Sequence, residues 1–150
     1  MLRIDTEQMR AIEAAAERAY PAECCGLLAG FAEDADALRV SRVVISRNVT
    51  TSDARDSFEV DPQVRFDLMR ACDAGAGERL IGHYHSHPDH PAKPSARDLA
   101  MAFEPELVWV IVGVADGRAD CAKAFRLGSD GKAFREIELQ VRPSTDGRTS

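Results

Sequence analysis

The sequence predicts a single α/β domain whose mixed, mainly antiparallel β-sheet is flanked by helices. Two segments have the three- or four-residue apolar spacing of amphipathic helices, and short Val- and Ile-rich runs typical of strands surround them. Strands and helices do not alternate regularly, which excludes a doubly wound parallel sheet. A chain of 150 residues is long enough for one domain with its own core.

The first part of the chain is predicted to form a helix followed by three strands. Asp5 or Thr6 can cap the helix, and Pro21 ends it. Its apolar residues recur every three or four positions, as one buried face requires: Met9, Ile12, Ala16 and Ala19. The strands are expected at residues 24–30, 37–49 and 57–61, with a polar loop at 52–57.

The second part is predicted to begin with a helix at Asp61, with Pro62 at the first helical position. It is followed by a strand (80–86), a proline-punctuated loop (88–94), a helix from Ser95 and a strand (107–115). Turn signals at Asp116-Gly117 and Asp130-Gly131 divide the remainder into two strands that end near Val141. Residues 1–141 are therefore expected to form the domain, and residues 142–150 a polar C-terminal tail.

Charge and composition exclude several classes of partner. The net charge is −6, which argues against nucleic-acid binding and against docking on anionic membranes. No run approaches the length of about 20 apolar residues needed to cross a bilayer, and no signal peptide is evident, so a cytoplasmic protein is expected. None of the four cysteines is spaced as C-x-x-C, and they are expected to be reduced and mostly buried.

Candidate metal ligands concentrate in one short segment, since all four histidines lie between His83 and His90. His83, His85 and His87 are spaced by two, so on a strand their side chains share one face. Two imidazoles on a rigid strand favour a zinc site, although strand periodicity alone leaves the choice of pair open. An exposed, histidine-rich strand without a ligand is the alternative.

A helix start follows closely at Pro94-Ser95-Ala96-Arg97-Asp98. Ser95 and Asp98 form the pattern of a capping box, which by itself implies no function. A carboxylate in the first turn is also favoured by the helix dipole and can point toward a metal. Two histidines and one carboxylate would leave a fourth zinc position open, the arrangement of catalytic zinc.

These segments resemble the signature of the JAMM (MPN+) metallopeptidases. Residues 82–88 read Gly-His-Tyr-His-Ser-His-Pro, and the ten residues 88–97 then lead to Asp98, with Ser95 completing S-x-x-D. The upstream segment Pro-Ala-Glu-Cys-Cys-Gly-Leu-Leu-Ala-Gly at 21–30 is similar to the glutamate segment of compact prokaryotic members. Asn48 and Phe-Glu-Val-Asp-Pro at 58–62 are weaker features in a suitable order.

The resemblance implies an MPN/JAMM fold, related to that of cytidine deaminases, and one zinc ion per chain. By the same resemblance His85, His87 and Asp98 are the zinc ligands, Glu23 is the general base, and Ser95 donates a hydrogen bond to the oxyanion. His83 is then expected to be a supporting or packing residue and His90 to be solvated. Cys24 and Cys25 are expected to pack rather than to act as nucleophiles, because the histidines they would need already have a role.

The implied activity is hydrolysis of a peptide or isopeptide bond after the C-terminal Gly-Gly of a ubiquitin-like or sulfur-carrier protein. This activity would trim a tail or release an attached amino acid from a β-grasp carrier. The alternatives are a non-catalytic MPN-like interaction module and a RadC-like protein. Serine rather than asparagine between His85 and His87 favours the peptidase. The sequence leaves the oligomeric state open, a homodimer included.

Overall fold

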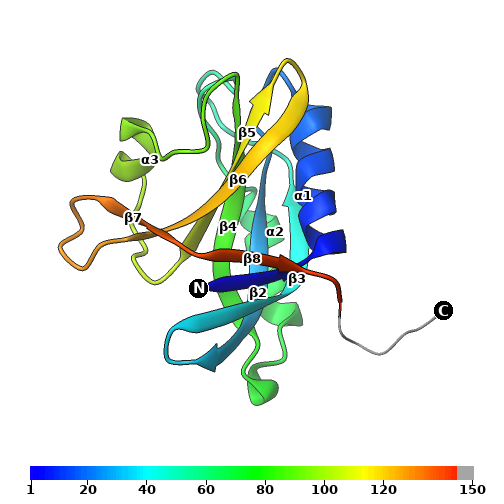
Figure 1. Cartoon of the computed structure of the whole chain (residues 1–150), viewed down its shortest axis with the longest axis vertical. Helices are drawn as coiled ribbons and strands as arrows, with labels where there is room; N and C mark the ends of the chain where they lie inside the picture. Colours follow the sequence, from blue (N-terminus) through cyan, green and yellow to red (C-terminus); the bar gives the residue numbers. More distant parts are fainter. Residues whose placement is uncertain (145–150) are drawn as a thin grey trace.

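The computed structural model describes residues 1–144 (Figure 1). Its helices are α1 (Thr6–Ala19), α2 (Pro62–Ala71) and α3 (Ala96–Ala100), with a 3₁₀ turn η1 (Ala74–Ala76). The strands are β1 (Leu2–Asp5), β2 (Cys25–Asp34), β3 (Ala37–Ser46), β4 (Arg79–Pro88), β5 (Val108–Ala115), β6 (Arg118–Leu127), β7 (Phe134–Ile137) and β8 (Leu139–Arg142). Residues 145–150 of the expected C-terminal tail lie outside the described residues.

All eight strands belong to one sheet, in the order β7-β6-β5-β4-β2-β3-β1-β8. Three pairings are parallel (β1–β3, β1–β8 and β4–β5) and the other four are antiparallel, which confirms the mixed, mainly antiparallel sheet. Strands β7 and β8 are separated only by Glu138, yet β7 pairs with β6 and β8 with β1. The two ends of the sheet therefore meet at this residue.

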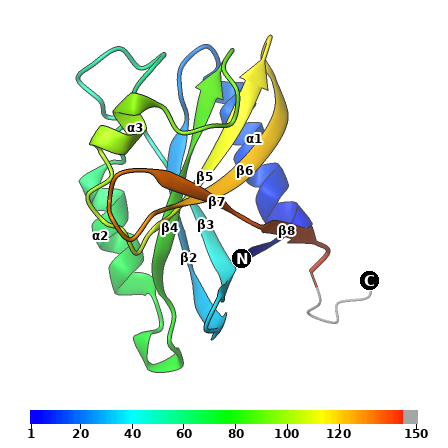
Figure 2. The ribbon, with the colours of Figure 1, turned by 60° about the vertical axis from the view of Figure 1, so that its left-hand side comes forward.

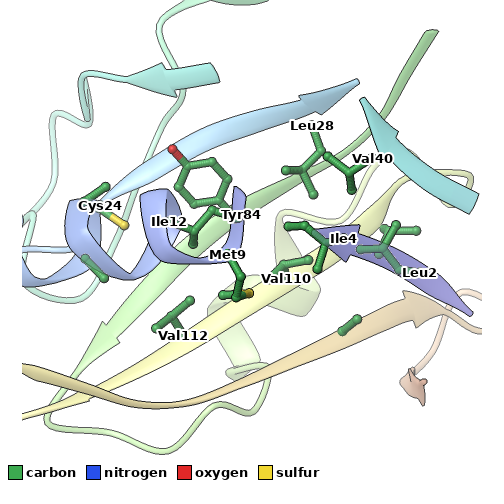
Figure 3. Packing of buried hydrophobic residues seen from close by; sticks show 14 of the residues in the cluster. Leu2, Ile4, Met9, Ile12, Cys24, Leu28, Val40, Tyr84, Val110 and Val112 are labelled. Atoms are coloured by element: carbon green, nitrogen blue, oxygen red, sulfur yellow. The ribbon is translucent and has the colours of Figure 1, made fainter. Parts of the chain in front are cut away.

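The sheet separates α1 on one face from α2 and α3 on the other (Figure 2). Asp5 caps α1 by accepting a hydrogen bond from the backbone of Gln8, and the Gln8 side chain accepts one from the backbone of Asp5. The buried stripe of α1 then packs against the sheet, from β6 and β5 through β4 and β3 to β1 and β8 (Figure 3). The largest apolar cluster forms there, and it includes Leu2, Ile4, Met9, Ile12, Leu28, Tyr84, Val110 and Val112.

Tyr84 explains why β2 carries a glycine at position 26. The ring of Tyr84 is fully buried and lies over the neighbouring strand, opposite Gly26. A Cβ at Gly26 would be 2.3 Å from the phenol ring, far inside van der Waals contact. The core therefore depends on the missing side chain at this position.

We expect Gly26→Ala to destabilise the fold by about 1–3 kcal/mol, the usual cost of forcing extra atoms into a packed core. Urea unfolding would measure this loss. Gly75→Ala is the matched control, because a Cβ there would meet its nearest neighbour, Asp73, at an ordinary 3.5 Å. An equal and small effect of both substitutions would show that Tyr84 can move aside.

The structure corrects one expected strand and adds another. Residues 57–61 do not form a strand; they make only an isolated bridge between Val60 and Asn48. The reason is that the Asn48 side chain takes up backbone groups of Ser57 and Glu59 that a strand partner would need. Strand β1 was not predicted, although its alternating Leu2 and Ile4 are fully buried. The final predicted strand is divided into β7 and β8, because its two halves pair at opposite ends of the sheet.

The four cysteines form no disulfide; Cys24 and Cys25 are buried as expected, whereas Cys72 is half-buried and Cys121 is exposed. Within residues 1–144, no helix has both the length and the apolar character needed to cross a membrane.

Candidate metal centre

Strands β2 and β4 bring the expected histidines and glutamate to one face of the sheet. His85 and His87 are two residues apart on β4, so both side chains project from the same face. In the antiparallel pairing of β2 with β4, Cys25 lies opposite His85. The same register, continued by two residues, places Glu23 opposite His87. Glu23, His85 and His87 are all buried.

Helix α3 brings the expected carboxylate to the same place. The Ser95 side chain accepts a hydrogen bond from the backbone N–H of Asp98 (3.0 Å), and Asp98 Oδ2 accepts one from the backbone N–H of Ser95 (2.9 Å). The Asp98 carboxylate also lies 3.2 Å from Nε2 of His85 and 3.1 Å from Nε2 of His87. The Asp98 side chain therefore completes the capping box of α3 and also faces both imidazoles. A helix cap and a metal ligand are thus compatible roles for this motif.

The donor atoms have the spacing of a metal site. Nε2 of His85 and Nε2 of His87 lie 3.0 Å apart, a separation at which two lone pairs repel unless a proton or a cation lies between them. Donors bound to one tetrahedral zinc ion at about 2.0–2.1 Å lie roughly 3.4 Å from one another, close to the separations found here. The residues present therefore fit a bound metal ion.

The imidazole of His87 is oriented by the loop that follows β4. Its Nδ1 lies 3.1 Å from the backbone carbonyl oxygen of Pro91. A carbonyl only accepts, so Nδ1 carries a proton, and Nε2 becomes the ligand atom when a metal ion takes the place of the proton that it shares with Asp98. Gly113 allows this loop to approach β5, because a Cβ there would lie 3.3 Å from the carbonyl oxygen of His90.

Burial and hydrogen bonding determine the protonation states of His85, His87 and Asp98. Burial lowers the pKa of His85, which favours a neutral imidazole. Burial alone would also lower the pKa of His87, but Asp98, the Pro91 carbonyl and Glu23 outweigh it and raise this pKa. Burial opposes ionisation of Asp98, yet the hydrogen bonds from His85 and His87 hold its pKa well below the usual range. Asp98 is thus a carboxylate, the form that binds metals.

Glu23 is a second carboxyl group beside the histidines. A carboxylate oxygen of Glu23 and ring nitrogens of His85 and His87 all lie within 4.8 Å of one another. Burial raises the pKa of Glu23 to about 8. Its backbone is held on both sides: its N–H donates to the carbonyl of Ala54, and its own carbonyl accepts from the Asn48 side chain. A group of this kind can gain or lose a proton near neutral pH.

His83 and His90 lie apart from this cluster. The His83 ring packs edge-on against Trp109 at 4.2 Å and lies 5.8 Å from the ring of Phe58. Its position in an aromatic cluster agrees with the expected packing role. The side chain of His90 is exposed, as expected.

Residues on the opposite face of β4 hold the strand in place. Tyr84 lies in the core, and Ser86 Oγ accepts a hydrogen bond from the backbone N–H of Cys24 (2.8 Å). Burial raises the pKa of the Cys24 thiol to about 11 and that of Cys25 to about 12. These shifts disfavour the thiolate forms, in keeping with the packing role expected for both cysteines.

A pocket of about 220 Å³ lies beside Asp98, between the loop after β3 and α3. It is lined by Thr50, Thr51, Ser52, Ser57, Arg97 and Asp98, with Phe58, Glu59 and Met101. The last three residues also line a second cavity of about 170 Å³, whose other walls include Leu27, Phe103, Leu107 and Trp109. A larger cavity of about 470 Å³ lies between β1, β3 and residues 142–144 and contains none of the clustered residues.

Two groups that contact the histidines were not identified from the sequence. The Phe58 ring stacks on His85, with centroids 4.2 Å apart and planes 16° from parallel. Its place in the Phe-Glu-Val-Asp-Pro segment was noted, but a loop phenylalanine gives no sign of what it will touch. The Pro91 carbonyl that orients His87 is a backbone group and leaves no side-chain signal.

Comparison with known proteins identifies the family of the chain. Residues 5–128 match the family of prokaryotic homologues of the JAB domain, and the chain belongs to that family. It is 36% identical over 121 residues to the desampylase of Haloferax volcanii, covering 81% of this chain and 79% of that protein. It is 31% identical over 127 residues to the CysO-cysteine peptidase of Mycobacterium tuberculosis, covering 85% and 83%.

Solved structures give the same fold. A protein of Desulfitobacterium hafniense superimposes with a TM-score of 0.82 at 30% identity, over 99% of this chain and 97% of that one. A JAB1/MPN domain protein of Archaeoglobus fulgidus superimposes with a TM-score of 0.58 at 21% identity, over 93% and 98%. These likenesses confirm the predicted JAB1/MPN fold.

Proposed function

We propose that this chain is a zinc-dependent metallopeptidase that holds one zinc ion through His85, His87 and Asp98. The observation that carries the proposal is the convergence of both Nε2 atoms and the Asp98 carboxylate, with separations of 3.0–3.2 Å. Three protein donors leave one tetrahedral position open, as catalytic zinc sites require. When bound, the ion polarises the scissile carbonyl and makes water acidic enough to be deprotonated near neutral pH.

Glu23 and Ser95 supply the remaining groups of the proposed mechanism. Glu23 takes a proton from the attacking water and passes it to the leaving amine, for which a pKa near the working pH is best suited. Ser95 already accepts a hydrogen bond from Asp98 N–H, and its hydroxyl hydrogen is free to be donated to the developing oxyanion. Burial of Glu23 and both histidines keeps the reacting groups away from bulk water.

The proposed substrate is a peptide or isopeptide bond after the C-terminal Gly-Gly of a ubiquitin-like or sulfur-carrier protein. Two relatives support this: one is named a desampylase and the other a peptidase acting on CysO-cysteine. The pocket beside Asp98 is bordered by Thr50, Thr51, Ser52 and Ser57, polar groups to which the backbone of an extended tail can bond. Glycines suit such a passage because they let the backbone approach closely.

The direct test uses carrier proteins extended beyond Gly-Gly by one or more residues. Incubation with the zinc-loaded protein should release the extension and leave a free Gly-Gly carboxylate, detected as a mass change in the intact carrier. Replacing the last glycine with leucine should block the cut, because a side chain there cannot pass beside the site. Glu23→Gln protein is the control for contaminating proteases.

Cleavage of an unrelated unstructured peptide, with no cleavage of any carrier, would contradict the carrier-directed activity and leave a general peptidase. No cleavage of either substrate by a fully zinc-loaded protein would instead favour a non-catalytic interaction module.

A further inference from the structure

The two histidines of the site are supported in different ways. His87 is oriented through a hydrogen bond from its Nδ1 to the Pro91 carbonyl. The Nδ1 of His85 is buried and has no hydrogen-bond partner within residues 1–144. Histidines that bind metals nearly always have such a partner on the second nitrogen, because it holds the ring in place. Another contact must therefore orient His85.

Aromatic rings enclose His85 where that hydrogen bond is missing. Phe58 stacks on the imidazole, with ring centroids 4.2 Å apart and planes 16° from parallel. Trp109 meets the same imidazole edge-on, at 5.6 Å and 84°. A stacked ring and a perpendicular ring together fix the plane of the imidazole, because a tilt would cause steric overlap with one of them. The Asp98 carboxylate then selects the edge that carries Nε2.

The Asn48 side chain bonds to the backbone of the loop that carries Phe58 at several points. Asn48 Nδ2 donates to the carbonyls of Glu23 (3.2 Å) and Ser57 (3.0 Å). Asn48 Oδ1 accepts from the backbone N–H groups of Thr50 (3.2 Å) and Glu59 (3.0 Å). These four bonds use the full capacity of an asparagine amide. Asn48 thus joins the backbone of Glu23 to residues on both sides of Phe58.

We propose that Phe58 is a positioning residue that orients the His85 imidazole for metal binding, in place of the hydrogen bond that His85 lacks. Asn48 holds Phe58 in register with Glu23, so one loop aligns a metal ligand and the base. Phe58 also lines both the pocket beside Asp98 and the neighbouring cavity, which places this support directly beside the proposed substrate path. The inference rests on the proposed zinc site, but it concerns metal affinity rather than activity.

The test is the zinc dissociation constant of purified variants, measured by competition with a chromogenic chelator. Phe58→Leu keeps an apolar side chain but removes the flat face, and it should weaken zinc binding by about tenfold or more, the range for loss of an outer support. Phe58→Tyr keeps the face and should bind zinc as the wild type does. Phe31→Leu is the matched control, because Phe31 lies on β2 six residues beyond Cys25, the residue opposite His85, and its ring faces the Arg39 guanidinium.

Thermal unfolding of each metal-free variant separates positioning from simple loss of stability. Should Phe58→Leu fail to fold, Asn48→Asp provides the second measurement, because it removes both donors but keeps the acceptor, and it should also weaken zinc binding. Wild-type affinity in the folded Phe58→Leu or Asn48→Asp protein, or equal weakening in Phe31→Leu, would overturn the inference. A wild-type protein that binds no zinc would instead overturn the proposed function.

Discussion

Glu23→Gln should reduce turnover by about 10²–10⁴-fold while leaving zinc bound, because this is the usual contribution of a general base. Gln has nearly the shape of Glu but cannot take a proton from water. The buried position of Glu23 makes the neutral amide a mild substitution for the fold. The measurement is kcat on a verified substrate together with the zinc content of the same sample. Near wild-type turnover would show that Glu23 is not the base.

In the metal-free protein, Glu23→Gln should also change how the free energy of unfolding depends on pH. Burial raises the pKa of Glu23 to about 8, so the folded state holds a proton that the unfolded state has released. This contribution to stability is complete below the unfolded pKa of about 4.3 and is lost as the pH rises toward 8. The glutamine of Glu23→Gln does not titrate, so the variant does not lose stability in this way as the pH rises. The stability of the variant relative to wild type should therefore increase between about pH 5 and pH 9 in urea unfolding.

Removal of a ligand should have the second large effect. His87→Ala should weaken zinc binding by more than about 100-fold, which exceeds the cost of losing an outer support. Asp98→Asn should also lose most of the metal, because the charge is gone. The asparagine oxygen can still accept from Ser95 N–H, so the cap of α3 remains and the loss can be assigned to the metal site. Elemental analysis and chelator competition measure both variants.

His83→Leu is the matched control for these ligands. His83 lies on the same face of β4 but packs against Trp109, so its replacement should leave zinc content unchanged. Full zinc in His87→Ala with loss in His83→Leu would mean that the other histidine pair binds the metal.

The part of the site that is local in the chain could be predicted from the sequence. His85 and His87 share a face because they are two residues apart on a strand, and Asp98 lies in the first turn of the next helix. Strand periodicity could not choose between His83 and His87. The position of Glu23 depends on the pairing of β2 with β4, which joins residues some 60 positions apart, so only family resemblance indicated it.

The unpredicted features depend on contacts between distant segments. Strand β1 forms because Leu2–Asp5 pairs with β3 and with Leu139–Arg142, and this four-residue segment has no strong strand signal alone. Residues 57–61 alternate like a strand, but the Asn48 side chain satisfies their backbone instead. The stacking of Phe58 on His85 depends on that same loop conformation, so local sequence patterns could not predict it either.

The central claim is that one zinc ion bound at His85, His87 and Asp98 supports hydrolysis, and zinc titration of the metal-free protein tests it most directly. The protein would be stripped with a chelator, zinc added back in fractions of an equivalent, and the rate of carrier cleavage measured at each step. The account predicts no cleavage without zinc and a linear rise that stops at one equivalent per chain. Full activity in the stripped protein, or restored activity in Asp98→Asn at one equivalent, would contradict it.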